Sequence, residues 1–140
     1  MSTLVRWYIK SALVALTLAM LAGALVLLNH SLGIDSRLAV LQLVFYHLLM
    51  VGWATQLIAG VALWMFPPFS REQPRGDERL GWLAFGALNG GLLLRVMGEP
   101  LHTWTGGPLT AGMLVVSALL QAFAIWAIVL LLWPRVRGKK

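Results

Sequence analysis

The sequence has no cysteine and few charged residues. Without cysteine, disulfides, thiolate metal sites and cysteine nucleophiles are excluded. Only 11% of the 140 residues are charged and 59% are hydrophobic, whereas roughly 25% of the residues in a soluble domain are charged. The sequence contains no hydrolase, kinase or nucleotide-binding motif. The run GALNGGLLLR is rich in glycine, but it lies in an apolar stretch where glycines serve helix packing and not phosphate binding. The composition predicts an integral membrane protein.

Four apolar runs are long enough to cross a hydrocarbon layer of about 30 Å, which takes about 20 helical residues. They cover Ser11–Leu28, Leu38–Phe66, Leu80–Gly98 and Leu109–Trp133. The segments between them contain Gly, Pro, Ser, Asn and Asp, which favour turns. We therefore predict an all-α fold in which residues 1–140 form a single integral membrane four-helix bundle.

The basic residues predict how the bundle is oriented, because Lys and Arg collect in cytoplasmic loops. They precede the first run, separate the second from the third, and follow the fourth: Arg6, Lys10, Arg71, Arg75, Arg79, Arg135, Arg137, Lys139 and Lys140. We thus expect a multi-pass protein of the cell inner membrane. Both of its termini are expected to be cytoplasmic. We expect the lipid bilayer as partner and no nucleic acid, since this topological signal accounts for the net charge of +6.

The first apolar run also has features of a signal peptide. It follows Arg6 and Lys10, and the stretch LAGA would suit a cleavage site. The run is longer than a typical signal-peptide core, so we expect a retained first helix.

All three histidines are expected toward the outer side of the membrane. His30 closes the first helix, His47 lies in the outer part of the second, and His102 lies in the loop before the fourth. Arg95 and Glu99 are expected near the outer end of the third helix, four residues apart on one face. We predict a common depth for these polar residues.

Arg95 and His47 each have two interpretations. Arg95 either forms an intrahelical ion pair with Glu99, or binds an anionic ligand group such as a haem propionate or a lipid phosphate, since a buried arginine needs a partner. His47 either bonds to a neighbouring helix or binds a ligand. Its helix face, continued by Val51, Ala54, Ile58, Val61 and Met65, suits packing against a helix as well as against a flat macrocycle.

Other residues favour contacts between helices. The amides of Gln56, Asn89 and Gln121 lie near the middle of three helices, where they are expected to hydrogen-bond across the bundle. Gly86 and Gly90 form a GxxxG pattern, extended by Gly91, which predicts close helix contact within the bundle or between protomers.

The stretch YHLLMVGWATQLIAGVALWMFP resembles helix II of the haem-copper oxidase subunit I superfamily, including its short NnrS-like and oxidase subunit I-like members. The resemblance runs from Leu38 to Glu99 and is carried by His47, Leu48, Met50, Gly52, Gly60 and Pro67. It implies that His47 is an axial ligand to the iron of a haem near the outer face, with the propionates directed toward arginine. Phe45 departs from the family, which often has a second histidine at that position.

Three histidines on four helices cannot build the haem and metal centre of an oxidase, so we expect no oxygen reduction and a protein that is not an enzyme. The main hypothesis is that the protein binds a b-type haem through His47 and Arg95 and acts in electron transfer or haem handling. The second axial ligand would be His30, His102 or His47 of a symmetry-related protomer. A three-histidine copper or zinc site with Glu99 is a further possibility. The alternatives are a cofactor-free structural or assembly subunit and a small transporter or oligomeric channel. The expected protein partners are further copies of the chain or subunits of a respiratory complex.

Overall fold

The computed structural model describes residues 1–70, 72 and 76–136. Within them, four helices are long and apolar enough to cross a membrane. The first is α1 (Thr3–Leu32), and the second combines a 3-10 turn (Ser36–Val40), α2 (Leu41–His47), a π-helical segment (Leu48–Thr55) and α3 (Gln56–Met65). The last two are α4 (Glu78–Thr105) and α5 (Pro108–Leu132), followed by a 3-10 turn (Trp133–Arg135). The all-α architecture is as predicted.

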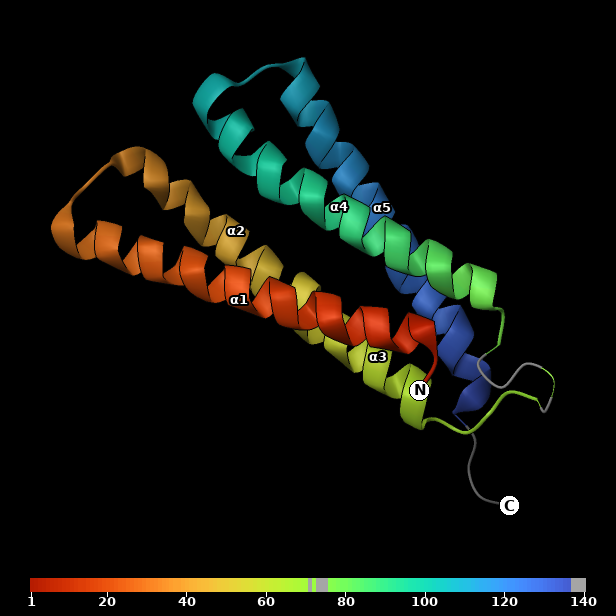
Figure 1. The fold of residues 1–140 in the computed structure, drawn as a ribbon. Coiled ribbons are helices and arrows are strands. Elements are labelled where there is room, and N and C mark those ends of the chain that lie inside the picture. The colour runs from red at the N-terminus through yellow and green to blue at the C-terminus, as the bar shows by residue number, and fades with distance from the viewer. Residues whose placement is uncertain (71, 73–75, 137–140) are drawn as a thin grey trace.

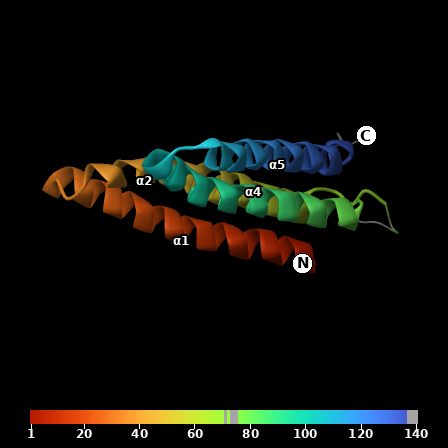
Figure 2. The ribbon, with the colours of Figure 1, turned by 90° about the horizontal axis from the view of Figure 1, so that it is seen from above.

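The bundle consists of two helical hairpins that diverge along its length (Figure 1). The N-terminus and the end of α5 lie at one end, here named the terminal end, where the hairpins meet. At the opposite end, named the far end, the turns at Gly33–Asp35 and Gly106–Gly107 are well separated. Seen from above, α1 and α5 lie on opposite sides of the molecule (Figure 2).

The apolar core reflects this divergence. Its larger cluster lies toward the terminal end and draws on all four spans, with Tyr8, Leu63, Leu88 and Ile128 among its members. The smaller cluster, Ala15, Ala19, Val44, Leu48 and Leu92, contains no residue of α5. Apolar packing between the hairpins therefore weakens toward the far end, where polar contacts take over.

Two helices are longer than the apolar runs predicted. The first begins at Thr3, where the Ser2 side chain accepts a hydrogen bond from the Val5 N–H, and ends at Gly33 in the left-handed conformation. The third was expected to end at Gly98, but α4 continues through Pro100 to Thr105. His102 is therefore on a helix, and its expected place in a loop was wrong.

The helix continues through Pro100 because proline removes only one backbone hydrogen bond, that to the carbonyl four residues earlier, and membrane helices tolerate this loss. The Thr103 hydroxyl also donates to the Glu99 carbonyl at 2.9 Å, within the same turn. Gly106 ends the helix, with its N–H donating to the His102 carbonyl at 2.9 Å.

The second span is interrupted directly after His47 by the π-helical segment. Its i to i+5 winding advances the helix less per residue than α-helical winding, so positions before and after it do not share one face. Ile58 and Met65, which the sequence placed on the same face as His47, are exposed. The Thr55 hydroxyl donates to the Met50 carbonyl, five residues earlier, at 2.8 Å.

Arg135 joins the two hairpins at the terminal end. Its buried guanidinium donates to the carbonyls of Phe66 at 2.7 Å, Pro67 at 2.9 Å and Leu63 at 3.1 Å. These carbonyl groups lie in the last turn of α3 or directly after it, where no further helical N–H group is available to donate to them. Arg135, one of the basic residues from which the orientation is predicted, therefore also caps α3.

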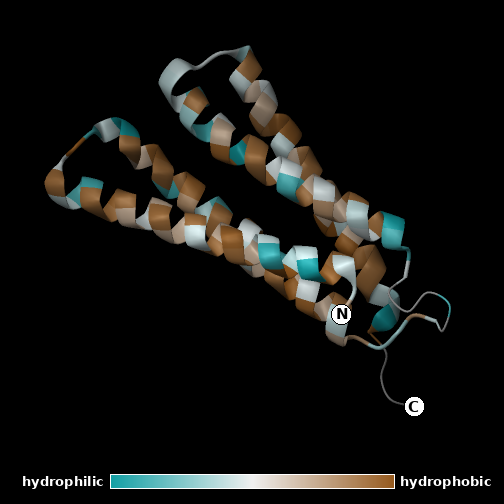
Figure 3. Cartoon of the chain, in the orientation of Figure 1, coloured by the Kyte–Doolittle hydropathy of each residue, from teal (hydrophilic) through white to brown (hydrophobic). Residues whose placement is uncertain are grey.

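The helices consist mostly of hydrophobic residues along their length (Figure 3), and many large apolar side chains are exposed. Large side chains such as Leu27, Leu119 and Trp126 are 65 to 69% exposed. A soluble protein rarely presents so continuous an apolar surface. Trp7, Trp64, Trp82 and Trp133 all lie near the terminal end and Trp104 near the far end, which suits two membrane interfaces.

Candidate functional site

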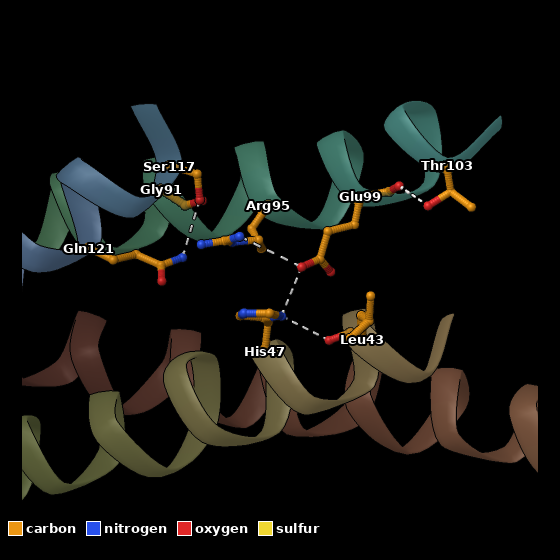
Figure 4. A network of polar contacts seen from close by, with 8 residues as sticks. All are labelled: Leu43, His47, Gly91, Arg95, Glu99, Thr103, Ser117 and Gln121. Atoms are coloured by element: carbon orange, nitrogen blue, oxygen red, sulfur yellow. Dashed lines mark hydrogen bonds and ion pairs between the residues drawn. The ribbon is translucent and has the colours of Figure 1, made fainter. Parts of the chain in front are cut away.

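A cluster of three polar side chains lies between the hairpins, nearer the far end. His47, the last residue of α2, points across the gap toward Glu99 on α4 (Figure 4). Its Nδ1 lies 3.2 Å from Glu99 Oε1, and the Arg95 guanidinium, one turn away on α4, lies 3.8 Å from the same oxygen. The cluster thus combines the expected Arg95–Glu99 pair with a contact between helices.

The imidazole of His47 is held by a second acceptor on its own helix. Nδ1 lies 2.9 Å from the Leu43 carbonyl oxygen, as well as 3.2 Å from Glu99. A carbonyl and a carboxylate only accept hydrogen bonds, so Nδ1 is assigned the proton. Nε2 then has a free lone pair in the neutral ring.

The cluster is largely shielded from its surroundings. The side chains of Glu99, Arg95 and His47 are 8, 21 and 28% exposed, respectively. Arg95 Nε and Glu99 Oε2 are buried and make no hydrogen bond within the described part of the chain. A charged residue in a membrane helix costs about 2.5 kcal/mol or more at mid-depth, and such residues usually serve a ligand, an ion or a specific partner.

The structure does not bring the other two histidines into this cluster. His30 is exposed in the last turn of α1, and His102 Nδ1 lies 2.9 Å from the Thr110 hydroxyl of α5. Among residues 1–70, 72 and 76–136, no three or more His, Asp or Glu side chains group as a metal site would require. The copper or zinc site built from three histidines and Glu99 is therefore not formed.

Two of the three amides, Gln56 and Asn89, form the contact between helices that the sequence predicted, and Gln121 does not. Asn89 donates to Gln56 Oε1 at 2.8 Å and to the Phe85 carbonyl at 2.9 Å. Gln121 instead donates within α5, to Ser117 Oγ at 3.5 Å, and the Ser117 hydroxyl makes the contact to α4 at the Gly91 carbonyl. Gln121 reaches its own helix because Ser117 lies one turn away.

The glycines of α4 also divide into two groups. A Cβ atom on Gly91 would lie 3.0 Å from the Ser117 carbonyl oxygen, so this glycine permits the close approach of α5. Cβ atoms on Gly86 or Gly90 would meet no atom of the described residues within 4 Å. The GxxxG pattern therefore does not pack against another described helix, and its contact with a second protomer stays a prediction.

Two features of the site have only weak signals in the sequence. The contact between His47 and Glu99 follows from a shared depth, but apolar periodicity does not reveal which helices face each other. The π-helical segment has no periodic signal, although Gly52 within it marks a close approach: a Cβ there would lie 2.8 Å from both Ala15 Cβ and Leu92 Cδ2.

Comparison of the chain with models of protein families, with curated proteins and with solved structures found no match.

Proposed function

We propose that this chain is a small membrane protein that binds b-type haem through His47, close to the far end of the bundle, and acts in electron transfer or haem handling. The observation that carries the proposal is the position of His47 Nδ1, between the Leu43 carbonyl and the Glu99 carboxylate. Histidines that bind metals usually donate their other N–H to such a group, which fixes the ring and its tautomer. The resemblance of the stretch around His47 to helix II of oxidase subunit I supports the same assignment.

The residues around His47 fit this role. Glu99 would hold the imidazole so that Nε2 faces the iron, and Arg95, whose Nε has no partner in the described chain, would pair with a propionate. A bound b-type haem supplies a one-electron redox centre whose potential depends on its axial ligands and on nearby charges.

For a second axial ligand, His47 of another copy of the chain is our first candidate. Within one chain, His102 is engaged with Thr110 and His30 lies exposed at the end of α1. A ligand shared between two copies would make the protein a homo-oligomer. A respiratory-complex subunit that supplies the ligand is the alternative partner.

The proposal is tested by the haem content of protein purified in detergent from cells with ample haem supply. The wild type is expected to show a Soret band, and His47→Ala to lose it, because the iron loses its ligand. His102→Ala is the matched control, since it removes an imidazole whose Nδ1 already bonds to Thr110. A wild type without haem, or a Soret band that His47→Ala leaves unchanged, would reject haem binding by His47.

One observation favours a second function, that of a cofactor-free structural or assembly subunit. The His47–Glu99 contact joins the hairpins where their apolar packing is weakest, so the cluster has a structural use without any ligand. In that case the purified protein is colourless, and His47→Ala lowers only the temperature of unfolding.

We further propose that the protein lies in the cell inner membrane with its terminal end in the cytoplasm. Arg6, Lys10, Arg79 and Arg135 support this orientation from the described part of the chain. Arg71, Arg75, Arg137, Lys139 and Lys140 belong to the same charge pattern but lie outside the described residues.

A further inference from the structure

A cavity of about 300 Å³ lies between α1 and α4, in the angle where the two hairpins begin to separate. It is lined along α1 by Lys10, Val14 and Leu18, and along α4 by Leu93 and Val96, with Leu48 also contributing. The spacing of three or four residues places each set on one helix face. Two helices thus turn apolar stripes toward a shared groove.

Aliphatic side chains dominate this groove. Val14 and Leu93 are 60 and 65% exposed. Asn89 also lines it, but its amide nitrogen already donates to Gln56 and to the Phe85 carbonyl. In a bilayer an apolar groove of this kind is filled by hydrocarbon, because water has no polar partners there.

The groove has a cation at the end nearer the termini. Lys10 lies seven residues after the start of α1, or about 10 Å along the helix, and its long side chain is exposed. A lysine at this depth extends toward the headgroups. Trp7 lies one turn nearer the terminus and packs edge-on against Phe85, with ring centroids 6.3 Å apart, as expected at a membrane interface.

We propose that this groove binds one acyl chain of an anionic phospholipid, with the lipid phosphate at Lys10. From Trp7 to Leu18 the groove follows α1 for about 16 Å, long enough to hold most of an extended acyl chain. The positive charge at one end selects the headgroup, and the aliphatic lining holds the chain. The site is separate from His47 and does not depend on haem.

Native mass spectrometry of the detergent-solubilised full chain, titrated with dioleoyl phosphatidylglycerol or dioleoyl phosphatidylcholine, tests the proposal. The wild type is expected to retain the anionic lipid about fivefold more strongly, because one lysine favours a headgroup of net negative charge, whereas the choline cation of phosphatidylcholine offsets its phosphate. Lys10→Gln should abolish this preference. Arg6→Gln, which removes the same charge from α1 outside the groove, should preserve it.

Val14→Trp tests the groove itself. A tryptophan on this exposed position would fill the space, so binding of both lipids should fall while the unfolding temperature stays near that of the wild type. Equal retention of the two lipids by the wild type would overturn the proposal. So would an equal loss of preference in Arg6→Gln and Lys10→Gln, or unchanged lipid binding by a folded Val14→Trp.

Discussion

At the scale of single residues, Glu99 is the centre of the site. One of its oxygens faces both the Arg95 guanidinium and His47 Nδ1, and its other oxygen has no partner in the described chain. Arginine and glutamate each carry a large cost in a membrane, which falls when they pair. The pair therefore presents His47 with a fixed acceptor, and the proposed role of Glu99 is to position the imidazole.

Removing the carboxylate should weaken haem binding. We expect Glu99→Ala to lower haem affinity about 10- to 100-fold, the usual effect of losing a group that orients a metal-binding histidine. Glu99→Gln, which keeps an oxygen acceptor, should recover much of this loss. Titration with haem, followed by the Soret band, measures the affinity.

Thr103→Ala is the matched control for Glu99, because it alters the next turn of α4 without touching the carboxylate. Unfolding temperatures of all three variants separate loss of fold from loss of affinity. Equal haem affinity in Glu99→Ala and the wild type would show that Glu99 does not position His47.

At the scale of elements, the π-helical segment sets where His47 and Gly52 point. Gly52 allows the second span to approach α1 at Ala15 and α4 at Leu92, two residues of the smaller apolar cluster. This close approach lies just after His47, so it fixes the distance across which the histidine reaches α4. π-helical segments are frequent at functional sites, which agrees with this position.

Gly52→Ala should therefore destabilise the fold by about 1–3 kcal/mol, as overpacking of a tight contact does. Its Cβ would lie 2.8 Å from Ala15 Cβ, which is attached to the backbone and cannot turn away. Gly86→Ala is the control, because a Cβ there meets no atom of the part of the chain that the structure describes within 4 Å. Unfolding in detergent measures both, and equal stability of the two variants would contradict the tight contact at Gly52.

The four helices could be predicted from the sequence because hydrophobic length alone identifies a helix that can span a membrane. Their ends were less predictable: Pro100 suggested an end to the third helix, but the loss of one hydrogen bond did not stop it. The π-helical segment was not predicted, since a register change of one residue leaves the composition of an apolar run unchanged.

The depth of the site residues could be predicted, but their contacts with other helices could not. Counting residues from the helix ends gave His47, Arg95 and Glu99 similar depths, and the structure places them in one cluster. The depth of a residue in the membrane does not give its direction around the helix axis. The pairing of His47 with Glu99 and the separate contact of His102 with Thr110 could therefore not be predicted from the sequence. Arg135 was assigned to topology alone, because its reach to the end of α3 depends on tertiary packing.

At the scale of the whole molecule, the two hairpins are joined by different chemistry at each end. Apolar packing and the carbonyl contacts of Arg135 hold the terminal end. Toward the far end the links are the His47 cluster and a hydrogen bond of 3.3 Å from the Trp104 indole to the Arg37 carbonyl. The hairpins are thus joined mainly by polar contacts on the side where we place the haem.

The proposed orientation can be tested with single cysteines, because the chain has none of its own. Ser31→Cys at the far end is expected to react with a membrane-impermeant maleimide in intact spheroplasts. Phe69→Cys, on the other side, should react only after lysis; both positions are exposed. The opposite labelling pattern would contradict a cytoplasmic terminal end.

The central claim, that His47 Nε2 binds haem iron, is tested most directly by chemical rescue. The measurement is the visible spectrum, oxidised and dithionite-reduced, of His47→Gly supplied with haem, before and after addition of imidazole. We predict that the variant lacks the b-type spectrum of the wild type and regains it with imidazole, which replaces the missing ligand in the space left by the side chain. A His47→Gly spectrum identical to that of the wild type without imidazole, or a wild type that binds no haem, would contradict the claim.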